Sequence, residues 1–159
     1  MSARRRTAVV TESIAASPEA VWQAVADVTR IGEWSPECTG CHWVGPVQEP
    51  RPGAQFVGSN RKGAVHWNTR CTVTHSQPRK VFAWRVRFGI SVAEWSYRLV
   101  AAGDGTRVEQ SWRDLRTGFP WRYVARIGDR LLSNGARAEH NEANMRATLS
   151  ALKRSLEFR

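Results

Sequence analysis

The feature that most limits the fold of this chain is a succession of short alternating segments between Cys41 and Asp114. Apolar and polar residues alternate within each segment, which is the period of a half-buried strand. The Asp104–Gly105 step between the last two segments is typical of a hairpin turn. Most connections are too short for a parallel crossover, so the pattern predicts an antiparallel sheet. The predicted strands are 7–14, 41–44, 54–61, 65–74, 81–88, a strand carrying Trp95 to Leu99, and 107–114, with a loop rich in Pro and Gly at 45–53.

Two short helices are expected between the first strand, whose Val10 and Ile14 face inward, and the second strand. Ser17, Pro18 and Glu19 predict a helix start, because they supply a hydroxyl cap, a proline at the first helical position and an acid near the positive dipole end. The apolar stripe of this helix consists of Val21, Trp22, Val25 and Val28. A second short turn starts at Asp27, carries Ile31 and Trp34, and ends before Pro36.

A long amphipathic helix is predicted from Ala136 to Glu157, with Ser133, Asn134 and Gly135 as its capping residues. One face of it carries, at helical spacing, Ala138, Met145, Leu149, Leu152 and Leu156. The first half of the same side offers only small or polar residues, namely Ala138, Asn141 and Asn144. We therefore expect this helix to close the core at one end and to leave room for a cavity at the other.

Composition sets the outer limits of function. The chain has 159 residues, the size of one domain, and its 24 Lys and Arg against 14 Asp and Glu give a net charge of +10. The basic residues are spread along the sequence and no nucleic-acid-binding motif is present, so we expect no nucleic acid partner. No apolar run has membrane-spanning length and no signal-peptide core follows the basic start, so we expect a cytoplasmic protein with free thiols at Cys38, Cys41 and Cys71.

The inferred inner face of the sheet has the composition of a binding pocket. Its residues are Phe56, Asn60, Trp67, Thr69, Phe82, Trp84, Trp95, Tyr97, Gln110 and Trp112. Aromatic rings dominate, a few neutral groups can form hydrogen bonds, and no Asp, Glu, Lys or His is among them. We count Trp34, Asn141 and Met145 with the candidate ligand-binding residues. The alternative is that these rings fill an ordinary core.

Several stretches together resemble a known family. They are SPEAVW after the first strand, GEWSPE closing the second helical turn, PGAQF, and WSYRLVAAGDGTRVEQSW as the last hairpin. The chain resembles the START-like (SRPBCC) superfamily over nearly its whole length, and most closely its polyketide cyclase/dehydrase and lipid-transport group, which is common in actinobacteria. The resemblance implies an α+β helix-grip fold, in which a curved antiparallel sheet of about seven strands surrounds a long C-terminal helix and a hydrophobic cavity. Members include carriers, sensors and enzymes, so the resemblance supplies no catalytic residue.

These observations predict a domain that binds an aromatic, polyketide-like or lipid-like molecule as a carrier or sensor, without a cofactor or metal, as a monomer or homodimer. One alternative is an aromatase/cyclase that positions a flexible substrate, with Tyr97 as the acid and with Asn60 and Gln110 orienting carbonyl groups. A shift of register by one residue would instead bring Glu94 or Glu109 inside. A further alternative is an interaction or toxin-like module without a ligand.

Two other motifs need interpretation. Cys38, Cys41 and His42 form the haem-attachment pattern C-x-x-C-H, or half of a zinc or redox site, but no second cysteine pair follows and we interpret it as a coincidence in a short strand. The segment Gly118 to Leu132 alternates aromatic and aliphatic residues with arginines. It is either a lid that touches an acidic ligand group or, transiently, an anionic membrane, or a plain connecting segment with a solvated basic face.

Overall fold

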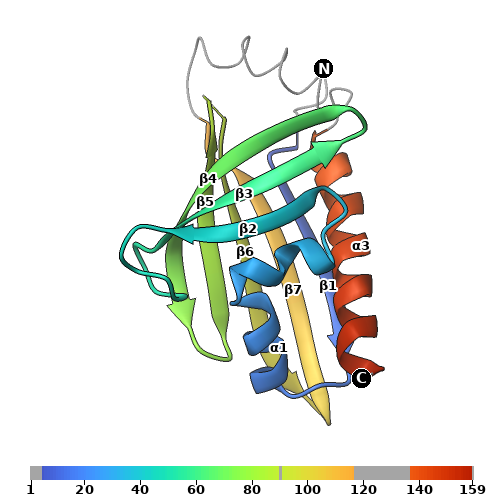
Figure 1. The fold of residues 1–159 in the computed structure, drawn as a ribbon. Coiled ribbons are helices and arrows are strands. Elements are labelled where there is room, and N and C mark those ends of the chain that lie inside the picture. The colour runs from blue at the N-terminus through green and yellow to red at the C-terminus, as the bar shows by residue number, and fades with distance from the viewer. Residues whose placement is uncertain (1–4, 90, 117–136, 159) are drawn as a thin grey trace.

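The structure, a computed structural model, describes residues 5–89, 91–116 and 137–158 (Figure 1). In chain order its elements are β1 (Thr7–Ile14), α1 (Pro18–Val25), the 3-10 helix η1 (Val28–Glu33), β2 (Cys38–Val44), β3 (Gln55–Lys62), β4 (Val65–Gln77), β5 (Val81–Phe88), β6 (Ser91–Ala102), β7 (Gly105–Asp114) and α3 (Arg137–Glu157). The strands form a seven-stranded antiparallel sheet in the order β1-β7-β6-β5-β4-β3-β2. Figure 1 shows this sheet curving beside α3, which packs against β1 and β7. The predicted succession of elements along the chain and the antiparallel pairing are therefore confirmed.

The two predicted helices lie between β1 and β2. The Ser17 Oγ accepts a hydrogen bond from the Ala20 amide at 3.2 Å, and Pro18 begins α1, as the sequence predicts. The Asp27 carboxylate accepts from the Thr29 amide at 3.1 Å and caps η1, which is a 3-10 helix. Trp22 of α1 meets Phe82 of β5 edge to face at 6.1 Å, so α1 closes this end of the core.

Several strands are longer than predicted. β2 begins at Cys38 instead of Cys41, because a bulge between Cys38 and Gly40 interrupts the alternation that the prediction relied on. β4 extends to Gln77, whereas the prediction ended it at Thr74. Its register with β5 shifts between Val73 and His75, so the alternation breaks there as well. An extra residue reverses which side chains face inward, so simple alternation ends at the bulge.

The inner face of the sheet is the predicted one. It carries Phe56, Phe82, Trp84 and Tyr97. These four side chains are buried, and Tyr97 pairs with Gln110 across β6 and β7. The shifted register that would place Glu94 or Glu109 inside is not adopted. Glu94 lies on the outer face and accepts a hydrogen bond from Arg113 Nη2 at 3.0 Å, and Glu109 lies opposite Arg98.

Helix α3 buries the predicted stripe. Its buried residues include Ala138, Asn141, Met145, Leu149 and Leu152, and Leu156 is half-buried. The C-terminal half is also fastened to β1, because Lys153 Nζ donates to the Ser13 carbonyl at 2.7 Å and Glu157 accepts from the Ala15 amide at 2.7 Å. The predicted capping residues Ser133 to Gly135, the predicted first residue Ala136, and the segment Gly118 to Leu132 lie outside the described residues.

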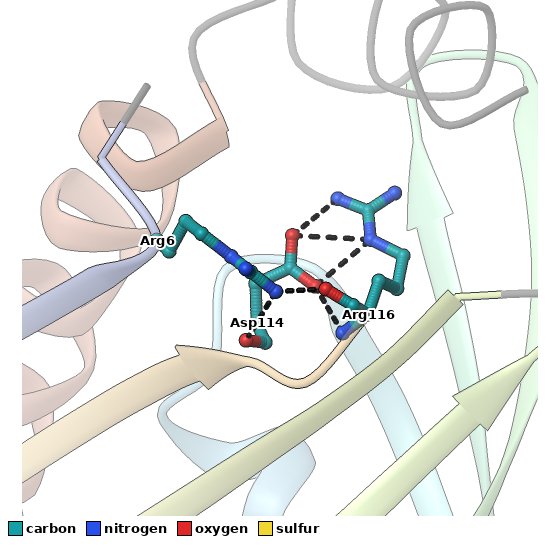
Figure 2. A network of polar contacts seen from close by, with 3 residues as sticks. All are labelled: Arg6, Asp114 and Arg116. Carbon is teal, nitrogen blue, oxygen red and sulfur yellow. Dashed lines mark hydrogen bonds and ion pairs between the residues drawn. The ribbon is translucent and has the colours of Figure 1, made fainter. Parts of the chain in front are cut away.

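A polar network joins the end of β7 to the start of β1. The Arg116 side chain donates to both Asp114 carboxylate oxygens, with Nε at 2.8 Å from Oδ1 and Nη2 at 2.5 Å from Oδ2. Arg6, the residue before β1, donates to the backbone carbonyls of Asp114, at 3.3 Å, and of Arg116 (Figure 2). These contacts hold the end of β7 and the two residues after it against the start of β1.

Among the residues that the structure describes, no helix is both long enough and apolar enough to cross a membrane.

Candidate functional site

A small hollow lies between the sheet and the N-terminal end of α3, and its volume is about 60 Å³. It occurs where the sequence predicts room, beside the half of α3 that carries small and polar residues. Its apolar wall comes from β4, β5 and β6 and consists of Trp67, Val86, Phe88, Ala93 and Trp95. Its polar wall comes from the residue before β2, from β4 and from α3, and consists of Glu37, Thr69, Arg137, His140 and Asn141.

The apolar wall follows from strand geometry. Side chains two residues apart in a strand point to the same face, so Trp67 and Thr69 of β4 share the inner face. Trp95 of β6 lies on that face too, two strands away, with Val86 of β5 between them. Two indole rings therefore face one hollow across the width of three strands.

The polar wall contains an acid–base pair that the sequence analysis did not identify. His140 Nε2 forms a hydrogen bond with Glu37 Oε1, and Asn144 Nδ2 lies 3.2 Å from the same ring nitrogen. The predicted site included residues of the helix, such as Asn141, but no acidic residue and no histidine. Glu37, which precedes β2, and His140 of α3 were therefore missed. The four-residue spacing of His140 and Asn144 places these two side chains on one helical face, so the sequence could have indicated their contact. It gave no signal for the contact between His140 and Glu37.

Asn141 is the other notable polar residue of the hollow. Its side chain is 7% exposed, and within the described part of the chain its Nδ2 has no hydrogen-bond partner. A buried donor without a partner costs about 1 to 3 kcal/mol, so such groups usually meet a water molecule or a ligand. The amide of Asn141 is thus available to an acceptor inside the hollow.

The remaining predicted site residues lie elsewhere in the core. Phe82 and Trp84 have ring centroids 5.5 Å apart, Trp84 and Tyr97 are 5.8 Å apart, and Phe56 is 6.2 Å from Trp84. Buried with them are Trp34, Gln110, Trp112 and Met145. These rings occupy the middle of the space between the sheet and the helices, which is why the hollow is small.

Two polar groups of that deeper region are worth describing. Gln110 Nε2 donates to the Tyr97 hydroxyl at 3.2 Å, and burial raises the pKa of this phenol above its ordinary value. Asn60 lies closer to the hollow, where its Nδ2 is 3.4 Å from Thr69 Oγ1. Four residues of the predicted set thus line the hollow: Trp67, Thr69, Trp95 and Asn141. Asn60 forms a hydrogen bond with one of them, Thr69, and the other predicted residues lie deeper in the core.

The three cysteines carry free thiols. Cys38 Sγ and Cys41 Sγ are 3.5 Å apart, whereas His42 is exposed and follows Cys41 in the strand, so it points to the opposite face. Over residues 5–89, 91–116 and 137–158, no group of three or more His, Cys, Asp and Glu side chains is arranged to hold a metal ion.

Comparison with known proteins agrees with this architecture. The family described as polyketide cyclase/dehydrase and lipid transport matches residues 5–157. The Polyketide_cyc-like protein Cgl2372 from Corynebacterium glutamicum is 30% identical, with 95% of this chain and 91% of that chain covered and a TM-score of 0.64. No curated protein matches the chain.

Two more distant structures show the same fold. Ara h 8.0201 is 11% identical, with 96% of this chain and 98% of that chain covered and a TM-score of 0.71. DynU16, from the dynemicin biosynthetic locus, is 19% identical, with 96% of this chain and 48% of that chain covered and a TM-score of 0.65. The family match and the curved seven-stranded sheet beside a C-terminal helix lead to one conclusion: the chain is a helix-grip protein that belongs to the polyketide cyclase/dehydrase and lipid-transport family.

Proposed function

We propose that the protein binds a hydrophobic small molecule whose polar end enters the hollow beside Asn141, and that it acts as a carrier or sensor. The observation that carries this proposal is the buried side-chain nitrogen of Asn141, which has no hydrogen-bond partner in the described part of the chain. Asn141 lines the same hollow as Trp67 and Trp95. A carbonyl or ether oxygen of a ligand would accept from this amide while an adjacent ring contacts the indoles. Membership of a family whose description includes lipid transport supports the same function.

The size of the hollow limits how a ligand fits. Pockets for drug-sized ligands enclose roughly 300 to 1,000 Å³, whereas this hollow measures about 60 Å³. It accommodates one end of such a molecule, and we expect the remainder to lie outside the hollow. We also propose that the chain is a single domain, since the family match extends over residues 5–157.

A titration of tryptophan fluorescence with a panel of aromatic ketones and fatty acids tests this function. Replacing Asn141 with Leu removes the donor but keeps the approximate volume, so the affinity for a ligand that bears a carbonyl should fall on the order of tenfold. Asn68→Leu is the matched control, because Asn68 is exposed on the outer face of β4 and should leave affinity unchanged. If the wild type binds no compound saturably, the proposal fails and a module without a ligand becomes the better interpretation.

The contact between Glu37 and His140 favours an enzyme of the aromatase/cyclase type as a second candidate. A histidine held by a carboxylate is a common general base, and here it would remove a proton next to a ligand carbonyl while Asn141 donates to the developing oxyanion. His140→Gln distinguishes the two functions, since it should abolish formation of an aromatic product from a poly-β-ketone but retain binding. A wild type that binds the poly-β-ketone without converting it would exclude this second candidate.

A further inference from the structure

The bulge in β2 brings two thiols together that a regular strand would separate. Residues three apart in a strand point to opposite faces, so Cys38 and Cys41 would not meet without a distortion. Cys38 pairs with Asn60 and Gly40 with Ser59, so two steps along β2 correspond to one along β3, and Thr39 is the extra residue. The bulge therefore reverses the alternation, and the two sulfur atoms lie 3.5 Å apart.

The surroundings of the pair allow the sulfurs to approach each other. Gly58 lies opposite Cys41 in β3, and a Cβ at this glycine would lie 3.4 Å from Cys41 Sγ. Cys38 and Cys41 are half-buried, whereas Cys71 is 3% exposed, so the pair is more accessible to a small solute than Cys71 is. A disulfide needs sulfurs about 2 Å apart, so closure requires a movement of roughly 1.5 Å.

The two sulfurs also differ in character. A hydrogen bond from the Cys41 thiol lowers the pKa of Cys38, and the same contact, together with burial, raises the pKa of Cys41. Burial raises the pKa of Cys71 to about 12. Cys38 is thus the thiol suited to nucleophilic attack, Cys41 stands beside it as the resolving thiol, and Cys71 is inert.

We propose that Cys38 and Cys41 form a dithiol site that reacts with hydroperoxides and closes to an intrachain disulfide. The Cys38 thiolate attacks one peroxide oxygen, the O–O bond breaks, and the departing oxyanion takes up a proton, which leaves Cys38 as a sulfenic acid. The Cys41 sulfur then attacks the Cys38 sulfur, the S–O bond breaks, and the oxygen leaves as water with the Cys41 proton. In total the two thiols lose two electrons and two protons, and hydrogen peroxide becomes two water molecules.

Peptide mapping after treatment of the reduced, chelator-washed protein with hydrogen peroxide tests this proposal. Trypsin does not cleave before Pro52, so Cys38 and Cys41 fall in the peptide 31–61, while Cys71 falls in the peptide 71–79. We expect peptide 31–61 to become lighter by two hydrogen atoms while Cys71 remains open to alkylation after unfolding. A cross-link from 31–61 to 71–79, a disulfide between two chains, or no oxidation of 31–61 would overturn the proposal.

Three variants assign the roles of the thiols. Cys38→Ser should slow oxidation of the remaining thiols on the order of tenfold, because the nucleophile is lost. Cys41→Ser should leave a Cys38 sulfenic acid that dimedone traps, and Cys71→Ala should form the disulfide as the wild type does. If Cys38→Ser oxidises as fast as the wild type, the assignment is wrong. Thermal melts verify that the variants fold, and the wild-type peptide map decides the main claim without them. The result does not depend on what occupies the hollow.

Discussion

Gly58 shows how one missing side chain shapes the polar part of the inner face. It lies between Cys41 and Thr69 in neighbouring strands, and a Cβ at this position would stand 3.0 Å from Thr69 Oγ1 and 3.4 Å from Cys41 Sγ. Thr69 lines the hollow and accepts a hydrogen bond from Asn60. A glycine here therefore lets the strands keep their register while three polar side chains meet.

Gly58→Ala should destabilise the protein by about 1 to 3 kcal/mol, because the added methyl group, 3.0 Å from Thr69 Oγ1, displaces the Thr69 side chain in a packed interior. Urea unfolding measures this loss. Gly40→Ala is the matched control, since a Cβ at Gly40 meets nothing within 4 Å, and it should change the free energy of unfolding by less than about 1 kcal/mol. Equal effects of the two substitutions would contradict the crowding described at Gly58.

The ionisation of Asp114 should make the stability of the protein depend on pH. Partial burial opposes ionisation of this carboxyl group, but the hydrogen bonds from Arg116 outweigh burial and hold its pKa below the ordinary value. A carboxyl group whose pKa is lower in the folded state stabilises the protein above its unfolded pKa, about 3.9. That contribution is lost as the pH falls from there through the folded pKa.

Replacing Asp114 with Asn should reduce this acid-dependent loss and lower stability at neutral pH by about 1 to 3 kcal/mol. Urea unfolding at pH 7 and at several values below pH 4 measures both effects. Asp104→Asn, in the exposed β6–β7 turn, is the control and should leave the pH profile of the wild type intact. An unchanged profile for Asp114→Asn would mean that its network contributes nothing to acid stability.

At the scale of the elements, alternation and turn residues were enough to predict the seven strands and the antiparallel pairing of consecutive strands from β2 to β7, but not the pairing of β1 with β7. The faces of β4 to β7 followed from the same rule, because large side chains such as Trp84 and Tyr97 can be buried on one side only. The start of β2 was not predictable, since nothing in the residues around Thr39 marks the extra residue of the bulge. The sequence likewise predicted a short helical turn at η1 but not its 3-10 hydrogen-bond pattern, and η1 packs against β2.

The side chains that helix α3 buries should stabilise its docking more than its exposed ion pair between Arg146 and Glu142 does. Leu149→Ala should cost about 2 to 5 kcal/mol, because Leu149 is 1% exposed and its removal leaves a cavity in the core. Arg146→Ala removes only an exposed ion pair with Glu142 and should cost about half a kcal/mol. Chemical denaturation compares the two. A loss for Leu149→Ala as small as that for Arg146→Ala would show that the helix is not docked as described.

At the scale of the whole molecule, the sequence anticipated part of the candidate site. It identified Trp67, Thr69, Trp95 and Asn141 from the faces of two strands and a helix, and the structure places all four around one hollow. It did not identify Glu37 and His140, because their contact joins positions 103 residues apart, one just before β2 and one in α3. It also did not distinguish rings that line a hollow from rings that fill the core, since both face inward. The binding role of all these residues remains a prediction.

The most direct test of the central claim is an NMR titration of isotope-labelled protein with the tightest compound from the ligand panel. Binding in the hollow should shift the indole N–H signals of Trp67 and Trp95 and the side-chain amide signal of Asn141, all with one saturation curve. The indole signals of Trp22 and Trp112, which lie in the deeper core, should shift much less. Saturable shifts confined to the outer face of the sheet, or no saturable shift at Trp67, Trp95 and Asn141, would contradict a ligand site between the sheet and the N-terminal end of α3.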